Sequence, residues 1–392
     1  MGAEDGEREL LRQTVEDMLA GHCTPARVAA AAAGSGWDEG LWQALEETGL
    51  TLAGSPEEAG GSGGDLLAAA DIVAAAGAAA APVPLAETLA AGMVLARAGL
   101  AIPGGPLTVA VASGRGGGLG SGAALGSGAA LRRVPYGRLA TTVAAGSGER
   151  GDWLAVLAPA GGRHGRNLAG EPRDDVDPGA DTEAHAVPAG TADYARRLLR
   201  LFRSLLIAGA AQRALDLTVT YVKEREQFGR ALAKFPTVQQ ELARMAGEVA
   251  LISAATQAAV AAEGHAVAGP AVAGAPFAGP NVPAVLAAKA QASQGAGIVA
   301  AIAHQLHGAI GTTEEHRLRL TTTRLWSWRD EDGSEAECFA ELGRAALRAV
   351  TGTGAGTGAG AGTGTGAGTG AGARTGGLWP WLSGSPGAGP PV

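Results

Sequence analysis

Three short stretches of the chain concentrate the residues that could do chemistry. The first, YVKEREQFG, places Arg225 and Phe228 beside Gly229, in a chain with only 4% aromatic and 17% charged residues. Taken alone, this pattern is typical of a helix end, with Lys223 and its charged neighbours in solvent, Phe228 as a core anchor and Gly229 as the C-cap. A helix end alone does not account for the scarce cations and aromatics gathered there.

The second stretch, HQLHGAIG, combines two histidines with a glycine turn. Gly308 and Gly311 lie where a helix must stop, and such a turn exposes backbone N–H groups that can contact a phosphate or pyrophosphate. His304 and His307 are three residues apart and lack a third ligand nearby. We therefore expect structural or cofactor-edge histidines, and no metal.

The third stretch, RLWSWRDEDGSEAE, crowds Asp330, Glu331 and Asp332 before a glycine. One interpretation is a solvated acidic loop. The other is a general base, because a carboxylate beside other carboxylates, or against Trp326 and Trp328, would have its pKa raised towards neutrality. The residues of this stretch leave both interpretations open.

Apolar periodicity predicts the elements that must position these stretches. Short helices are expected up to about residue 100, and the runs LTVAVA, ATTVAAG, DWLAVLAPA and AHAVPAG then predict strands between glycine-rich turns. Long helical patterns return after residue 193. The sequence thus predicts an α+β fold that is mostly α. We expect an N-terminal helical domain, a reduced middle β domain, a C-terminal four-helix bundle and a disordered Gly/Ala/Thr tail, over residues 1–102, 103–190, 191–350 and 351–392.

Composition bounds the setting of the protein. The net charge of −8 argues against a nucleic-acid partner. Cys23 and Cys338 fit neither a metal-ligand spacing nor a disulfide framework, and the acidic N-terminus differs from a secretory signal, so we expect a reducing cytoplasm. The most apolar run, residues 65–102, is broken by Pro82 and Pro84, which favours a buried helix pair over a membrane span.

Taken together, the three stretches resemble the acyl-CoA dehydrogenase family of flavoproteins. The likeness rests on RxxFG from Arg225, on F-x-x-V-Q-x-x-L-A from Phe235 and on QLHG-x-x-G from Gln305, in the family's order and spacing. PEEAGG and PLAETL add the family's N-terminal helical texture. The likeness spans about residues 5–348.

The resemblance implies FAD as the cofactor and a dimer of dimers as the assembly. In that family the RxxFG turn reaches across a subunit interface to the FAD of the neighbour, which assigns Arg225, Gln227 and Phe228 to cofactor binding. A guanidinium suits a pyrophosphate because its fork donates two hydrogen bonds. Further cofactor contacts are implied at Gln305, Gly308, Ala309 and Ser334. Ala309 replaces a usual glycine of the family, and Pro236 a usual glutamine.

The implied reaction is α,β-dehydrogenation of an acyl-CoA thioester, with electrons leaving to an electron-transfer flavoprotein. The family's catalytic carboxylate lies in an EGT turn, for which DGS stands in here, so Asp332 is the candidate base and Glu331 its rival. The position of the alternative base used by some members is Leu199, which cannot serve. Asp332 is one methylene shorter than glutamate, and misplacement of about 1 Å is costly in such a reaction.

The chain also departs from the family. The Thr-Glu and Gly-Ser-Asp segment that normally lines the flavin is missing between residues 103 and 189. This loss, with LWSWRDEDGSEAE and NLAGEPRDDVD, is similar to actinobacterial members that work as heterotetramers, including enzymes of sterol side-chain breakdown. The main hypothesis is a dehydrogenase that works alone or in a heterotetramer. The alternative is a non-catalytic subunit that completes the FAD site of another chain. A weakly active homotetramer, a helical scaffold without redox chemistry, and a flavin monooxygenase or nitroalkane oxidase also stay open.

Overall fold

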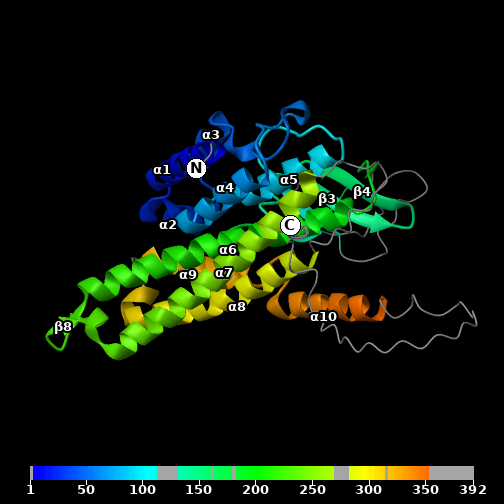
Figure 1. Cartoon of the computed structure of the whole chain (residues 1–392). Coiled ribbons are helices and arrows are strands. Elements are labelled where there is room, and N and C mark those ends of the chain that lie inside the picture. The colour runs from blue at the N-terminus through cyan, green and yellow to red at the C-terminus, as the bar shows by residue number, and fades with distance from the viewer. Residues whose placement is uncertain are drawn as a thin grey trace, which may run out of the picture.

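The computed structural model describes residues 3–112, 131–159, 162–178, 182–268, 282–313 and 317–352. The expected tail lies outside these residues, except for the end of the last helix. Helices dominate, as predicted, and the short strands, which follow the N-terminal helices in the chain, form one region at the right of Figure 1. The α+β, mostly helical fold is confirmed, while the exact division into domains stays a prediction.

The N-terminal part consists of short capped helices. They are α1 (Ala3–His22), α2 (Pro25–Ala33), α3 (Glu39–Glu47), α4 (Leu66–Ala79) and α5 (Leu85–Arg97). Asp38 and Asp65 act as N-caps, because their carboxylates accept the N–H groups of Leu41 and Ala68, both at 2.9 Å. The apolar faces of α4 and α5 are buried, so the prediction of a buried helix pair in this run is confirmed.

The β region forms two small sheets. A four-stranded sheet has the order β1 (Leu107–Val111), β3 (Thr141–Gly148), β4 (Gly151–Leu157), β6 (His185–Ala186), and each of these strands overlaps one of the four predicted runs. A second pair, β2 (Leu131–Pro135) with β5 (Arg173–Val176), was not predicted. All four residues of β5 are buried although three are charged, because Asp174 pairs with Arg138 at 2.6 Å and Arg173 pairs with Glu331 at 2.8 Å.

The C-terminal part is built around one long helix, α6 (Thr191–Glu224). It is followed by the hairpin of β7 (Glu226–Gln227) and β8 (Arg230–Ala231), and then by α7 (Pro236–Ala268), α8 (Val282–His307), α9 (Arg317–Trp328) and α10 (Glu335–Gly352). α6 packs against α7, α8 and α9, and its opposite side carries α4 and α5. Figure 1 shows this central position, with the β8 hairpin projecting at one end.

Two glycines allow α4 and α6 to cross in close contact. A Cβ on Gly209 would lie 1.9 Å from the carbonyl oxygen of Ala74, and one on Gly77 would lie 2.2 Å from that of Leu206. Any larger residue at either position must therefore push the helices apart. The crossing fixes the N-terminal helices to the centre of α6.

One described helix passes the length and composition test for a membrane span. It is the stretch Pro236–Gly264 of α7, and 33% of its 18-residue apolar window is buried inside the fold. α7 packs against both α6 and α8, which is the arrangement of a bundle helix. This single, partly buried helix is weak support for a span.

Candidate functional site

The RxxFG stretch forms an exposed hairpin at the end of α6. Glu226 and Gln227 pair with Ala231 and Arg230, and the two turn residues, Phe228 and Gly229, have φ angles of 51° and 76°. Two consecutive positive φ values are the requirement of a tight type I′ hairpin turn. The C-cap of α6 is Arg225, and Gly229 belongs to the turn, so the expectation of a Gly229 C-cap is wrong.

Phe228 and its neighbours point to solvent. The Phe228 ring is 91% exposed, so the interpretation of Phe228 as a core anchor is wrong. Arg225 and Gln227 are exposed as well, and neither side chain makes an ion pair or hydrogen bond within the described ranges. An exposed aromatic next to an exposed guanidinium is the composition of a binding surface.

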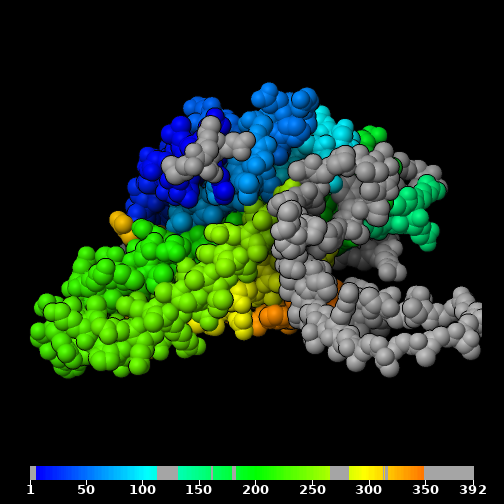
Figure 2. Space-filling model, in the orientation of Figure 1, coloured from blue at the N-terminus to red at the C-terminus, as the bar shows by residue number. Residues whose placement is uncertain are grey.

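The glycine turn after α8 lies close to this hairpin. Tyr221, one turn before Arg225, donates a hydrogen bond to the carbonyl oxygen of His307 at 3.3 Å, and the two rings stack at 4.3 Å. Gln305, Gly308 and Ala309 are all exposed there. The structure thus brings two of the three predicted stretches together near the end of α6, and the hairpin forms the left end of the molecule in Figure 2.

The two histidines of this turn have local partners. His304 Nε2 lies 2.9 Å from Thr322 Oγ1, and the buried His307 ring lies 2.8 Å from the carbonyl oxygen of Ala303 through Nδ1. Among the described residues, no group of three or more His, Cys, Asp or Glu side chains is arranged to hold a metal ion.

The third predicted stretch contacts α6 through Glu331 and Asp332, while Asp330 is exposed. Glu331 accepts hydrogen bonds from Arg173 Nε and Nη2, both at 2.8 Å, and lies 3.4 Å from Arg203 Nη1. Burial tends to raise the pKa of Glu331, but attraction to Arg173 and Arg203 outweighs it and lowers the pKa to about 2. The expectation of a raised pKa is therefore wrong for Glu331, and an ion-paired carboxylate of this kind is a poor base.

Asp332 is held in the same place by different contacts. Its Oδ2 accepts a hydrogen bond from Arg203 Nε at 2.8 Å, and its side chain is 18% exposed. Its φ of 57° is unusual for a residue other than glycine. The loop is fixed from below by the buried Lys289, whose ammonium donates to the carbonyl oxygens of Arg329 and Gly333 at 3.0 and 2.7 Å.

These contacts belong to a larger buried network that the sequence analysis missed. Arg203 contacts Glu87, Glu331 and Asp332, Arg173 contacts Glu171 and Glu331, and Arg324 lies 3.2 Å from Glu171. Four carboxylates thus face three guanidiniums. Burial raises the pKa of Glu87 despite Arg203 and Arg173, so Glu87 is the member best suited to hold a proton. The stretch NLAGEPRDDVD could have indicated this network, because it contributes Glu171 and Arg173.

The network leaves little free space. The adjoining cavity, bounded by Glu87, Tyr136, Arg203, Leu206 and Trp328, has a volume of about 10 Å³. That is room for about one water molecule. Trp328 closes it by donating from Nε1 to Glu171 Oε2 at 2.9 Å. An acyl group does not fit in this cavity.

Ser334 has a structural partner. Its backbone N–H donates to Glu337 Oε2 at 2.8 Å, and the N–H of Glu337 donates to Ser334 Oγ at 3.3 Å. This reciprocal pair is a capping box at the start of α10. A contact of Ser334 with a cofactor stays a prediction.

Comparison with known proteins identifies the class. Residues 5–101 match the model of the acyl-CoA dehydrogenase N-terminal domain, and residues 192–335 match that of the C-terminal domain. The chain is 33% identical over 325 residues to acyl-CoA dehydrogenase IpdE2 of Mycobacterium tuberculosis, covering 80% of this chain and 89% of that protein. The chain belongs to the acyl-CoA dehydrogenase family.

Two solved structures show the same fold. A variant of the Tcur3481–Tcur3483 steroid acyl-CoA dehydrogenase is 26% identical, with a TM-score of 0.76 over 88% of this chain and 99% of that one. The ChsE4–ChsE5 complex of Mycobacterium tuberculosis is 22% identical, with a TM-score of 0.71 over 86% of this chain and 96% of that one. The resemblance to the family is thereby confirmed, and each of these two structures is named for two proteins.

Proposed function

We propose that this chain is a subunit of a heteromeric, FAD-dependent acyl-CoA dehydrogenase and that it completes the flavin site of a partner chain. Of the two hypotheses set out above, the alternative is thus the one that the geometry favours. The observation that carries it is the ion pairing of both candidate bases, Glu331 with Arg173 and Arg203, and Asp332 with Arg203 at 2.8 Å. Carboxylates held by guanidiniums are poor bases, so the chemistry needs a carboxylate from a partner chain.

The exposed end of the molecule supports the same proposal. Arg225, Gln227 and Phe228 offer a guanidinium, an amide and an aromatic face, and Gln305 with the turn at Gly308 adds polar and backbone donors. Such a set fits the pyrophosphate and ring surfaces of a dinucleotide. Because these groups face away from the chain's own interior, they suit an FAD held by another subunit.

The chemistry of the assembled enzyme follows from the family. FAD supplies a hydride acceptor for the β hydrogen of an acyl-CoA, and its electrons pass on to an electron-transfer flavoprotein. The proton from the α carbon goes to a carboxylate, which we assign to the partner chain. The part of this chain is to bind and orient the cofactor through its α6 hairpin. A cytoplasmic location stays a prediction.

A second candidate is a self-sufficient dehydrogenase with Asp332 as the base. The observation in its favour is the positive φ of Asp332, since strained residues cluster at active sites. For this candidate to hold, Asp332 must leave Arg203 so that its carboxylate can meet the substrate.

Measuring the FAD content separates the two candidates. The full chain is purified alone, and again after co-expression with acyl-CoA dehydrogenase genes from its own genomic neighbourhood. The proposal expects a colourless chain alone and about half an FAD per chain in the complex. One FAD per chain in the protein alone, bleached by an acyl-CoA, would instead establish a self-sufficient enzyme.

A further inference from the structure

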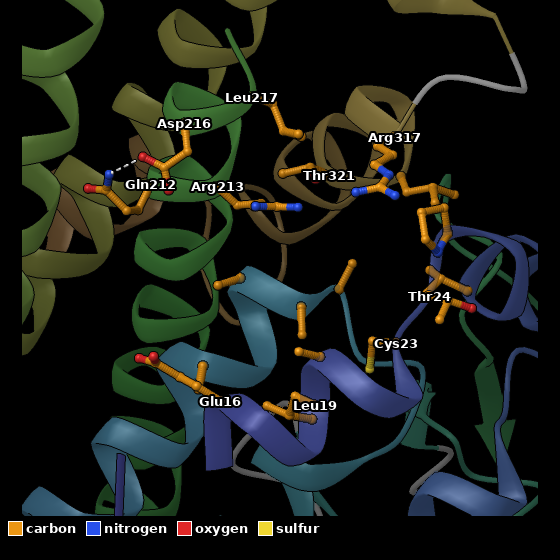
Figure 3. Close-up of a pocket in the computed structure, with 18 residues that line it drawn as sticks. Glu16, Leu19, Cys23, Thr24, Gln212, Arg213, Asp216, Leu217, Arg317 and Thr321 are labelled. Carbon is orange, nitrogen blue, oxygen red and sulfur yellow. Dashed lines mark hydrogen bonds between the residues drawn. The ribbon is translucent and has the colours of Figure 1, made fainter. Parts of the chain in front are cut away.

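A second and larger cavity lies on the other side of α4. It has a volume of about 560 Å³ and is lined by the end of α1, the start of α2, the end of α4, the C-terminal third of α6 and one face of α9 (Figure 3). Ala76 faces the small cavity beside Arg203, whereas Ala75, Ala78 and Ala79 face the large one. The volume lies in the range of small-molecule sites.

Two guanidiniums face each other across this cavity. Figure 3 shows Arg213 reaching in from α6 and Arg317 reaching in from α9, with Thr321 between them. Within the described ranges neither side chain has an ion pair or a hydrogen bond. Two like charges that point into one space repel, and an oxyanion placed between them would relieve that repulsion.

The acidic side chains of the cavity lie away from this pair. Asp216 accepts a hydrogen bond from Gln212 at 2.9 Å, and the two side chains lie together at the edge of the cavity. Glu16, on α1, is exposed and lies at the opposite end from Arg317. The region between the two guanidiniums is therefore positive, although the lining as a whole is balanced.

The floor of the cavity is apolar. Leu19 and Val28 from α1 and α2, with the alanines at the end of α4, form its floor. The Cys23 thiol also lines it, and burial raises its pKa to about 12, so it is neutral and adds no charge. A ligand that fits has one anionic end and an apolar body.

We propose that this cavity binds an amphipathic organic anion, whose oxyanion head lies between Arg213 and Arg317 and whose apolar body packs on the alanine floor. The head is a carboxylate or a phosphate monoester, since a guanidinium binds both in the same bidentate way. The site is independent of the proposed FAD surface, and its test does not need the partner's flavin.

The test is calorimetric titration of the full-length protein with decanoate, decyl phosphate and the neutral 1-decanol. We expect saturable binding of decanoate or decyl phosphate, with 1-decanol weaker by about tenfold or more. The preferred head group distinguishes a carboxylic acid from a phosphate ester. Arg213→Gln and Arg317→Gln should each weaken anion binding by about tenfold, whereas the matched control Arg344→Gln, at an exposed position of α10, should leave it unchanged.

Ala79→Leu supplies a second variant, because it fills the floor and leaves both guanidiniums in place. It should weaken decanoate and decyl phosphate alike. The proposal is overturned if neither anion binds saturably, if 1-decanol binds as well as they do, or if both arginine variants bind like the wild type.

Discussion

Arg203 Nε lies 2.8 Å from Asp332 Oδ2, so a buried guanidinium of the central helix occupies one oxygen of the carboxylate that the family resemblance assigns as the base. The same guanidinium contacts Glu87 and Glu331. A group that must accept a proton from a substrate needs an oxygen free to meet it. Because this ion pair engages Asp332, it bears on whether Asp332 or a carboxylate of the partner chain is the base.

Replacing Asp332 tests which chain supplies the base. In the assembled enzyme, Asp332→Asn should leave turnover within about twofold of the wild type, because the proposed base is on the partner. The variant should lose about 1–3 kcal/mol of unfolding free energy, since Arg203 loses a charged acceptor. Acyl-CoA turnover and urea unfolding measure the two effects. Abolished turnover with FAD retained would move the base to Asp332.

Removing the central cation should be more damaging. Arg203→Met leaves Glu87, Glu331 and Asp332 without one shared partner, and an uncompensated buried charge costs about 3–5 kcal/mol. Urea unfolding measures the loss. Arg344→Met, at an exposed site, is the control and should stay within about 0.5 kcal/mol of the wild type. A loss below about 1 kcal/mol in Arg203→Met would contradict the importance of the network.

The network also predicts how stability depends on pH. The pKa of Glu331 is about 2, below its ordinary value of 4.5, so its contribution is present above pH 4.5 and is lost as the pH falls towards 2. The difference amounts to about 3 kcal/mol. Glu87 acts in the opposite direction because its pKa is raised, so the measured loss should be smaller.

Urea midpoints between pH 6 and pH 3 measure this dependence, with Glu331→Gln as the comparison. The variant should be less stable at pH 6 and should vary less with pH than the wild type. A wild-type and variant curve that run parallel would show that Glu331 is not the group responsible.

Substitutions in the exposed hairpin should weaken FAD binding and leave the stability of the chain nearly unchanged. Arg225→Gln and Phe228→Ser should change the unfolding free energy of the chain by no more than about 0.5 kcal/mol, because both side chains are exposed. In the complex, each substitution should weaken FAD binding by about tenfold, because a charged or an aromatic contact is lost. The FAD retained after gel filtration measures this loss. Unchanged FAD retention in both variants would argue that the hairpin does not contact the cofactor.

Ser334 distinguishes a helix cap from a cofactor contact. Ser334→Ala removes the capping box with Glu337 and should lower the unfolding free energy by about 1 kcal/mol. Ser334→Thr keeps the hydroxyl acceptor and should recover most of that loss. If Ser334→Ala released FAD from the complex without affecting stability, the contact implied by the family resemblance would take precedence.

The helices and the apolar strands were predictable because their patterns are local. The runs around Leu107, Thr141 and Gly151 are apolar and bounded by glycines, and each contains a strand. β5 was missed because Arg173, Asp174 and Asp175 do not look like a buried strand. Their partners Glu331, Arg138 and Arg132 lie far away in the sequence, and only the folded chain brings them together.

Part of the candidate site was likewise predictable from the sequence, and part was not. The hairpin residues Arg225 and Phe228 were found because a short motif carries them, although the motif did not reveal their exposure. Glu331 and Asp332 were found as acids, but the sign of the pKa shift of Glu331 depends on Arg173, 158 residues away. A like-charge run in sequence suggests repulsion, and the fold instead surrounds it with guanidiniums.

The length of α6 has a mechanical consequence. Its middle is clamped by Arg203 and by the glycine contact at Gly209, while its end at Glu224 carries the hairpin into solvent. The hairpin stands about 30 Å along the axis from Arg203 at 1.5 Å per residue. A tilt of about 2° at the clamp would therefore carry Phe228 about 1 Å sideways. The helix works as a lever arm, so a substitution deep in the interior can misalign a cofactor contact that it never touches.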